Sequence, residues 1–280
     1  MMTGATQGDK EGGPPARRPT DQAASDRTMT DPTTSETAPG TPAISLVVPA
    51  FDEELRLPPT LERLAGELDD VFGPDWQLVV SDDGSSDRTA EVALDAARSE
   101  PRIVVVTNPV NQGKGAALVD GFAAATAPVV VFLDADLPVE PAELAPLVAA
   151  VADADVVVGS RRLPGSSFTS PQPWARRFGG GVFLQLVGLM GLRTSSDPQC
   201  GTKVLRRATT APVVAATTSQ GFAFDIELLV RARNAGLRTV DVPVRWHHAE
   251  GSSIRPVRDG ASTVGDLWRL RRRLRAPSAP

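Results

Sequence analysis

The segment VVVFLDAD, residues 129–136, decides the fold of this chain of 280 residues, because an apolar run leads directly into two aspartates. A short, continuous apolar run is typical of a strand that is covered on both faces of a sheet. Four other segments have the same character, at residues 44–48, 77–80, 103–106 and 155–158. The chain is therefore expected to contribute at least five buried strands to one sheet.

Segments with helical spacing separate these apolar runs. In residues 58–72, for example, Leu61, Leu64, Leu68 and Phe72 fall on one face of a helix. Further helices are expected at residues 88–99, 115–125, 141–151 and 226–235, and a sixth strand at residues 202–205. This alternation predicts an α/β fold: a doubly wound, mostly parallel sheet with helices on both faces, in a single domain.

Composition divides the chain into three parts. Residues 1–42 are rich in Thr, Pro, Gly, Ser and Asp and have almost no large apolar side chains, which predicts a disordered tail. The α/β domain is expected at residues 43–258, and a basic helix or tail at residues 259–280. The single cysteine, Cys200, excludes an intrachain disulfide and is expected to be a small buried side chain.

Charge and hydropathy limit the partners that the protein can bind and its location relative to a membrane. A net charge of −5 argues against general nucleic-acid binding. No apolar run reaches the roughly 20 residues that cross a bilayer, and glycines interrupt the longest one, residues 178–192. Residues 174–192 are expected to pack on the domain or to lie at a membrane surface, and the basic segment 269–275 either binds anionic lipid or ends a solvated helix. We therefore expect a cytoplasmic protein with peripheral contact at the cytoplasmic face of the membrane.

Acidic residues follow several of the predicted strands, where parallel strand ends converge on one crevice. Asp134 and Asp136 can both reach one cation, and their oxygens suit a hard divalent metal that would neutralise a leaving diphosphate. Taken alone, the pair favours a solvated turn at a strand end. Its position among other acidic strand ends favours the metal site.

Two further loops offer candidate ligand contacts. In the loop of residues 82–87, Asp87 is expected to cap the next helix, which leaves Asp82 or Asp83 free to accept from a base N–H or a ribose hydroxyl. In the loop of residues 111–115, glycines allow close backbone approach at a helix N-terminus, so Lys114 is a candidate phosphate contact. A glycine turn with a solvated lysine is an equally good interpretation of this second loop.

The ordered set of short motifs resembles the family-two inverting glycosyltransferases. The motifs are VPAFDEE at 48–54, DDGSSD at 82–87, NQGKG at 111–115, DAD at 134–136 and GSR at 159–161. They are most similar to the branch that makes polyprenyl-phosphate sugars, the dolichyl-phosphate β-glucosyltransferases and mannose synthases. The similarity continues through DPQCG at 197–201, FAFDIE at 222–227, VPVRW at 242–246 and GSS at 251–253, and covers about residues 44–255.

The resemblance implies a GT-A fold, a nucleotide-sugar donor, a polyprenyl-phosphate acceptor and Mg²⁺ or Mn²⁺ at the Asp-x-Asp pair. It implies three kinds of contact: nucleoside contacts by Pro49, Ala50, Glu53 and Asp83, ribose and metal-diphosphate contacts by Asp134 and Asp136, and an anion contact near the transferred sugar by Arg161. Where related glucosyl enzymes often read Gly-Ser-Lys, this chain has Gly-Ser-Ser at 251–253, so Arg255 or Arg258 would have to replace that lysine.

Two carboxylates in the second half are candidate catalytic groups. Asp197 is a turn residue or an active-site carboxylate, and the resemblance favours the site; for Asp225, capping of the helix at 226–235 is as good an interpretation as a site role. The adjacent His247 and His248 would point to opposite faces of a strand and are not expected to share a metal.

The expected reaction is transfer of a hexose to a polyprenyl phosphate, with inversion of the anomeric centre. UDP-glucose is the first candidate for the donor. Because a phosphomonoester is already ionised at neutral pH, it needs no strong general base. GDP-mannose or another nucleotide sugar is an alternative donor, and a soluble hydroxyl acceptor would require Asp197 or Asp225 as the base. A nucleotide-sugar-binding module without catalysis is the alternative of another class.

Overall fold

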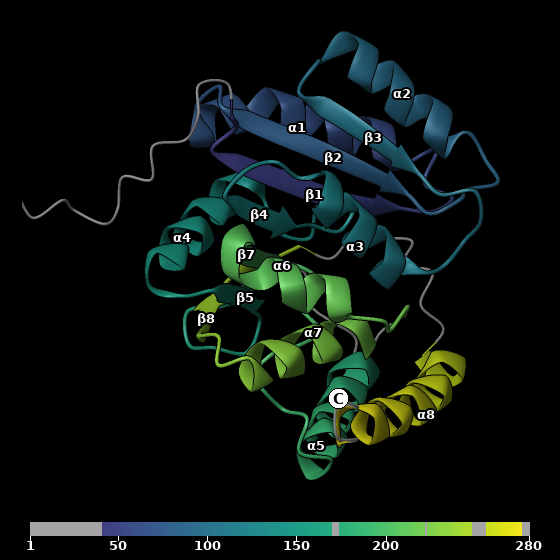
Figure 1. Ribbon diagram of the computed structural model, residues 1–280, viewed down its shortest axis with the longest axis vertical. Helices are drawn as coiled ribbons and strands as arrows, with labels where there is room; N and C mark the ends of the chain where they lie inside the picture. The colour runs from purple at the N-terminus through teal and green to yellow at the C-terminus, as the bar shows by residue number, and fades with distance from the viewer. Residues whose placement is uncertain (1–40, 170–173, 222, 248–255, 276–280) are drawn as a thin grey trace, which may run out of the picture. The chain divides into compact units, whose positions relative to one another are not determined.

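The computed structural model describes residues 41–169, 174–221, 223–247 and 256–275, with side chains for all of these except 174–179, 256–264 and 275 (Figure 1). Nearly all of the predicted N-terminal tail therefore lies outside the described residues. Among the described helices, none combines the length and the hydrophobicity needed to cross a membrane.

A seven-stranded sheet forms the centre of the fold, in the order β3-β2-β1-β4-β7-β5-β8. Only β7 runs antiparallel to its neighbours, so the predicted mostly parallel sheet is confirmed. The strands are β1 Ile44–Ala50, β2 Trp76–Asp82, β3 Ile103–Thr107, β4 Val129–Phe132, β5 Val156–Ser160, β7 Lys203–Arg206 and β8 Thr239–Pro243. Two short strands, β6 Ser167–Phe168 and β9 Arg245–Trp246, pair separately.

Helices cover both faces of this sheet, as the alternation of apolar runs predicted. Figure 1 shows α3 and α6 in front of the sheet and α1 behind it. The helices are α1 Leu57–Phe72, α2 Thr89–Ser99, α3 Lys114–Ala124, α4 Leu144–Ala149, α5 Trp174–Leu189, α6 Arg207–Ala216, α7 Ala223–Asn234 and α8 Pro256–Arg275. The predicted boundary at residue 258 thus falls inside α8.

Two local predictions were wrong, and both errors involve proline. The segment 141–151 is not one helix: 3₁₀ turns at Pro141–Glu143 and Ala150–Asp153 flank the short α4, because Pro146 lacks the N–H that a continuous helix would use. Strand β1 does not stop at Pro49 but continues to Ala50. Its pairing with β4 has already ended at Val47, so the missing N–H of Pro49 interrupts no hydrogen bond on that side.

The apolar strand runs form one core, and a smaller apolar cluster joins three helices. Central-strand residues such as Leu46, Val79 and Val131 have no exposed surface. The smaller cluster joins α5, α7 and α8, and its buried members are Val187, Leu192, Ile226, Val230, Leu267 and Leu270. This cluster attaches α8 to the domain.

Close packing of α3 on the sheet depends on Gly121. A Cβ placed at Gly121 would lie 2.4 Å from Cγ1 of Val47, a short buried side chain that cannot move aside. We expect Gly121→Ala to lower the free energy of unfolding by about 1–3 kcal/mol through overpacking. The matched control is Gly66→Ala in α1, where no atom lies within 4 Å; here the gain in helix propensity should raise stability by up to about 1 kcal/mol. Urea unfolding of both variants measures this, and equal changes at the two positions would contradict the packing argument.

Candidate active site

The loops that follow the parallel strands meet at one edge of the sheet. The loops after β1, β2, β3, β4 and β5 leave from this edge because those strands run in the same direction. Strand β7 runs the opposite way, so the segment that precedes it, residues 197–202, lies at the same edge. The edge therefore collects residues from both halves of the chain, including every predicted site residue that is described.

The loops after β1 and β2 hold each other through reciprocal hydrogen bonds. The backbone N–H of Ser86 donates to Asp52 (2.9 Å), and the backbone N–H of Arg88 donates to Glu54 (3.0 Å). Asp87 is structural, as expected, but it does not cap α2 directly. Helix α2 starts after Arg88, and Asp87 instead accepts from the backbone N–H groups of Thr89 (2.9 Å) and Glu54 (3.1 Å).

Asp82 and Asp83, the expected ligand acceptors, are both buried and already accept hydrogen bonds from loop residues; their contact with a ligand stays a prediction. Asp83 is 2% exposed, and its oxygens accept from the backbone N–H groups of Gln112 (2.9 Å) and Gly113 (2.6 Å). Asp82 is also buried and accepts from the backbone N–H and the hydroxyl of Ser85. Both carboxylates thus shape loops, because burial requires that they be hydrogen-bonded.

Residues of the first loop lie close to the aspartate pair. Pro49 is half-buried and Ala50 is buried, with the carbonyl of Ala50 accepting from the Asp83 N–H (2.9 Å). Glu53 forms an ion pair with Arg56 (2.5 Å). Burial raises the pKa of Glu53, Arg56 opposes this change, and the negative charge of Asp136 adds to it. The Glu53 carboxylate therefore lies within electrostatic range of the predicted metal site.

Asp134 and Asp136 lie on a tightly constrained turn after β4. The hydroxyl of Thr60, on α1, donates to the carbonyl of Ala135 (2.6 Å), and Leu137 has a positive φ of 42°, which is uncommon for a residue with a side chain. A Cβ at Gly201 would lie 2.0 Å from Oδ2 of Asp134. Position 201 must therefore be glycine for the Asp134 carboxylate to sit where it does.

The two aspartates of this pair have different electrostatic environments. The ammonium group of Lys114, the first residue of α3, pairs with Asp134. Burial alone would raise the pKa of Asp134, but Lys114 outweighs burial and holds that pKa below its ordinary value. The pKa of Asp136 is instead raised, first by burial and then by the charge of Asp134. Lys114, the predicted phosphate contact, is thus placed beside the predicted metal ligands.

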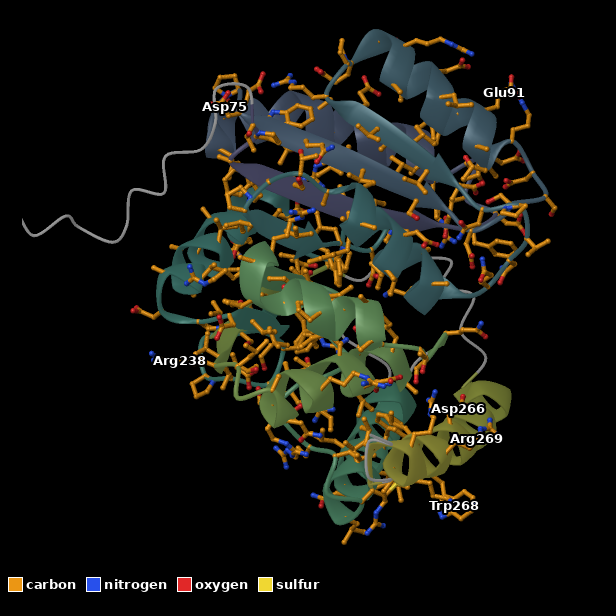
Figure 2. The ribbon with its side chains drawn as sticks, in the orientation of Figure 1. Asp75, Glu91, Arg238, Asp266, Trp268 and Arg269 are labelled. Atoms are coloured by element: carbon orange, nitrogen blue, oxygen red, sulfur yellow. The ribbon has the colours of Figure 1, made fainter. Side chains whose placement is uncertain are left out.

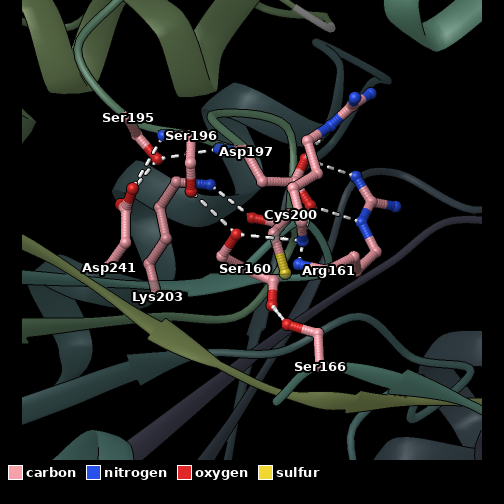
Figure 3. A network of polar contacts seen from close by, with 10 residues as sticks. Ser160, Arg161, Ser166, Ser195, Ser196, Asp197, Cys200, Lys203 and Asp241 are labelled. Atoms are coloured by element: carbon pink, nitrogen blue, oxygen red, sulfur yellow. Dashed lines mark hydrogen bonds and ion pairs between the residues drawn. The ribbon is translucent and has the colours of Figure 1, made fainter. Parts of the chain in front are cut away.

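An ion pair between the half-buried Arg161 and the buried Asp197 lies at the edge beside β5 (Figure 3). Nε and Nη2 of Arg161 donate to both oxygens of Asp197 at 2.6 and 2.8 Å, and the Arg161 backbone N–H adds a third bond (3.0 Å). Burial alone would raise the pKa of Asp197, which is 2% exposed, but Arg161 outweighs burial and lowers it. The Arg161 guanidinium also lies 4.6 Å from the centre of the Trp246 ring. Asp197 therefore positions Arg161 and is a poor proton acceptor.

A serine network that sequence reasoning missed fixes the backbone of Asp197. Asp241, on β8, accepts from the Ser195 hydroxyl and the Ser196 N–H, both at 2.7 Å, and Ser195 in turn accepts from the Asp197 N–H (3.1 Å). Figure 3 shows these residues together with Ser160, whose hydroxyl lies 2.8 Å from that of Ser196. The only sequence signal was an aspartate inside the apolar strand β8.

Asp225 is paired with a lysine that was also not predicted. Lys203, on β7, has no exposed surface, and its ammonium group donates to Asp225 and to the carbonyl of Cys200, both at 2.6 Å. Asp225 lies in the first turn of α7, so the capping and site interpretations both remain compatible with its position. Burial raises the pKa of the Cys200 thiol to about 11, which agrees with the predicted small buried side chain.

Several sequence predictions fall outside the described residues, and His247 pairs with a single carboxylate. The motif at 251–253, Arg255, His248 and the side chain of Arg258 lie outside the described residues. Nε2 of His247 lies 3.2 Å from Glu140. No group of three or more His, Cys, Asp or Glu side chains within the described ranges is placed to hold a metal ion.

Comparison with known proteins gives the family. The family model of Glycosyl transferase family 2 matches residues 45–209. A dolichyl-phosphate beta-glucosyltransferase of Trichomonas vaginalis is 33% identical over 228 residues, which cover 78% of this chain and 69% of that protein. A dolichyl-phosphate beta-glucosyltransferase of Drosophila melanogaster is 30% identical over 243 residues, covering 81% and 74%.

Solved structures agree on the fold. The glucosyl-3-phosphoglycerate synthase from Mycobacterium tuberculosis, in complex with Mn²⁺, uridine diphosphate and glucosyl-3-phosphoglycerate, superposes with a TM-score of 0.60. The match covers 85% of this chain and 82% of that chain at 21% sequence identity. With the acidic strand edge, the mostly parallel sheet and the match over more than half of its length, this chain belongs to Glycosyl transferase family 2 and has the GT-A fold.

Proposed function

We propose that this enzyme transfers a hexose, glucose from uridine diphosphate glucose, to the phosphate of a dolichyl-type polyprenyl lipid. The observation that carries this proposal is the pairing of Asp197 with Arg161 and of Asp225 with Lys203. These carboxylates were the candidate bases for a hydroxyl acceptor, and each is already matched by a buried or half-buried cation. A phosphate acceptor needs no such base, because its second pKa is near 6. Dolichyl-phosphate glucosyltransferases among the relatives support the same choice.

The donor would bind where the aspartate pair and the start of α3 meet. The pair offers hard carboxylate oxygens, and the raised pKa of Asp136 reflects burial and like charge that a cation would relieve. Bound at Asp134 and Asp136, Mg²⁺ or Mn²⁺ would supply positive charge beside the diphosphate. Lys114 and the N-terminus of α3 add positive charge at the same place.

The nucleoside would lie against the interlocked loops after β1 and β2. Pro49, Ala50 and Glu53 line the first of these loops, and Asp82 and Asp83 shape the second. We assign these five residues to nucleoside recognition, partly through the loop geometry that the aspartates maintain. Asp83 in particular sets the turn that leads to Lys114, so it connects the nucleoside and diphosphate ends of the site.

The acceptor phosphate would approach Arg161. Its guanidinium is held by Asp197 and by the Trp246 ring and keeps part of its side chain exposed (23%). An oxygen of the lipid phosphate would attack the anomeric carbon while the bond from that carbon to the diphosphate breaks, and the electron pair leaves with the nucleoside diphosphate. This single displacement inverts the anomeric centre. Such catalysis depends on positioning and charge stabilisation, for which prepositioned cations are suited. The reaction is proposed at the cytoplasmic face of a membrane, with the protein attached peripherally.

Removal of the Asp136 charge tests the metal assignment. We expect Asp136→Asn to lower turnover by about 100-fold, because charge at the leaving group is no longer stabilised. The substitution keeps the size of the side chain and removes a buried like charge, so the melting temperature should not fall. The matched control is Asp70→Asn on the exposed face of α1, which should keep full turnover. Unchanged turnover of Asp136→Asn, or undiminished wild-type activity in excess chelator, would remove the metal role.

The ionised acceptor makes a second prediction. Sugar transfer to a short polyprenyl phosphate should exceed transfer to the matching alcohol by at least about 100-fold, since the alcohol lacks a deprotonated oxygen and the paired carboxylates provide no base. The rate should also fall as the pH drops below about 6, where the phosphate gains its second proton. Product formation from labelled donor measures both effects. Transfer to a soluble hydroxyl acceptor, with none to lipid phosphate, would show a different member of the family.

A further inference from the structure

A cavity lies between α8 and the loop of residues 218–221, which joins α6 to α7. Its volume is about 760 Å³, and its lining includes Arg269, Arg272, Arg273 and Trp268 from α8. On the other wall are Thr218 and Ser219. None of these residues belongs to the nucleotide-sugar site proposed above, so this cavity has no role in the reaction as described so far.

The lining of this cavity is suited to an anion. The lining contains three arginines but only one carboxylate, that of Asp266. Asp266 forms an exposed i,i+3 pair with Arg269 (2.5 Å). Exposed pairs of this kind contribute little, so Arg269 remains available to a ligand. Arg272 forms no ion pair with a described side chain, and its guanidinium carbon lies 4.7 Å from the centre of the Trp268 ring. The planar fork of arginine matches phosphate oxygens in geometry as well as charge.

Buried charge holds the cavity in shape. Arg273 donates to the hydroxyls of Thr218 (2.5 Å) and Ser219 (3.1 Å) and lies 3.7 Å from Glu227. Glu227 has no exposed surface and also accepts from the Ser219 N–H (2.8 Å) and from Arg231 (2.7 Å). Arg273 therefore fixes α8 to the loop, while Arg269 and Arg272 are left to face a ligand.

The same loop packs against the start of α3, beside the proposed nucleotide-sugar site. The carbonyl of Gln220 accepts from the Gly115 N–H (2.7 Å), and a Cβ at Gly115 would lie 2.2 Å from the carbonyl oxygen of Ser219. Lys114, which pairs with Asp134, is the neighbour of Gly115 in the first turn of α3. One short loop thus separates the arginine-lined cavity from the start of α3.

Helices α5 and α8 lie side by side (Figure 1) and share a small apolar cluster. Both also carry exposed apolar side chains. Leu189 and Val182 on α5 are 82% and 55% exposed, and Trp268 on α8 is 53% exposed. Figure 2 shows Trp268 projecting from α8 away from the rest of the fold. Cationic and apolar side chains together are the chemistry of a surface that meets lipid headgroups and the adjoining acyl region.

We propose that this cavity binds the phosphomonoester headgroup of a membrane lipid, held by Arg269 and Arg272, with Trp268 and Leu189 in the apolar layer beneath. The identification of the lipid as the sugar acceptor rests on the proposed function. The phosphate chemistry itself does not, because phosphatidic acid presents the same group. In the acceptor case, the cavity would keep the lipid phosphate next to the loop that borders the start of α3.

The test compares two double variants with equal loss of charge. Arg269→Gln/Arg272→Gln removes the proposed ligand contacts. The control is Arg88→Gln/Arg98→Gln at the two ends of α2, where both arginines belong to exposed i,i+3 pairs, as Arg269 does. Neutral phosphatidylcholine vesicles would carry either polyprenyl phosphate or phosphatidic acid as a minor component. Binding is followed at low salt by co-sedimentation and by Trp268 fluorescence, with Trp268→Phe to isolate that signal. We expect about 30-fold weaker binding for the α8 variant, as about 1 kcal/mol per arginine implies, and wild-type binding for the control.

Each outcome decides a separate point. Weaker binding to both lipids supports a general phosphomonoester site, and weaker binding to polyprenyl phosphate alone assigns the cavity to the acceptor; in that case KM for the lipid rises while KM for the donor stays constant. Binding equal to that of the α2 control overturns the proposal. If the wild type binds phosphatidic acid through these arginines but transfers no sugar to polyprenyl phosphate, the proposed function fails and the cavity assignment stands.

Discussion

Buried negative charge at one edge of the sheet is the constraint on which the site depends. Burying a carboxylate without a partner costs several kcal/mol. This edge of the sheet contains several buried or half-buried carboxylates. Each is matched by a local group: backbone N–H groups for Asp83, Lys114 for Asp134, Arg161 for Asp197 and Lys203 for Asp225. Asp136 differs, since no ion pair joins it to a described basic side chain and its pKa is raised. The site therefore has an excess of negative charge at the position where a metal cation is proposed.

The architecture could be predicted from the sequence because it depends on short-range patterns. Apolar runs marked the strands, and an aspartate pair directly after one of them, at 134–136, placed the candidate site at a strand end. Proline accounts for the local errors, since the effect of Pro146 or Pro49 depends on which hydrogen bond its missing N–H would have made. The strand order that decides this for Pro49 is a property of the whole fold.

The partners of the site residues could not be predicted, because no spacing rule connects them. Arg161 and Asp197 are 36 residues apart, and Lys203 and Asp225 are 22 apart. Lys203 lies in the apolar strand β7. When its partner is unknown, a lysine in such a strand is expected to be exposed to solvent. Asp82 and Asp83 looked free in sequence because the loop amides that they accept from belong to other segments or to the turn itself. Motif order singled out residues that meet at one edge of the sheet; their hydrogen-bond and ion-pair partners follow from the three-dimensional fold.

The reversed direction of β7 has a consequence for how such a protein can diversify. Strand β5 ends and β7 begins at the same edge, so the chain between them, which includes α5, leaves the sheet and returns to it at the site. Insertions or replacements in this excursion, outside the short strand β6, need not shift the register of the seven-stranded sheet. Its two ends nevertheless carry Arg161 and Asp197, whose bidentate ion pair joins them. The segment between β5 and β7 can therefore change in evolution while the Arg161–Asp197 ion pair keeps both of its ends at the candidate active site.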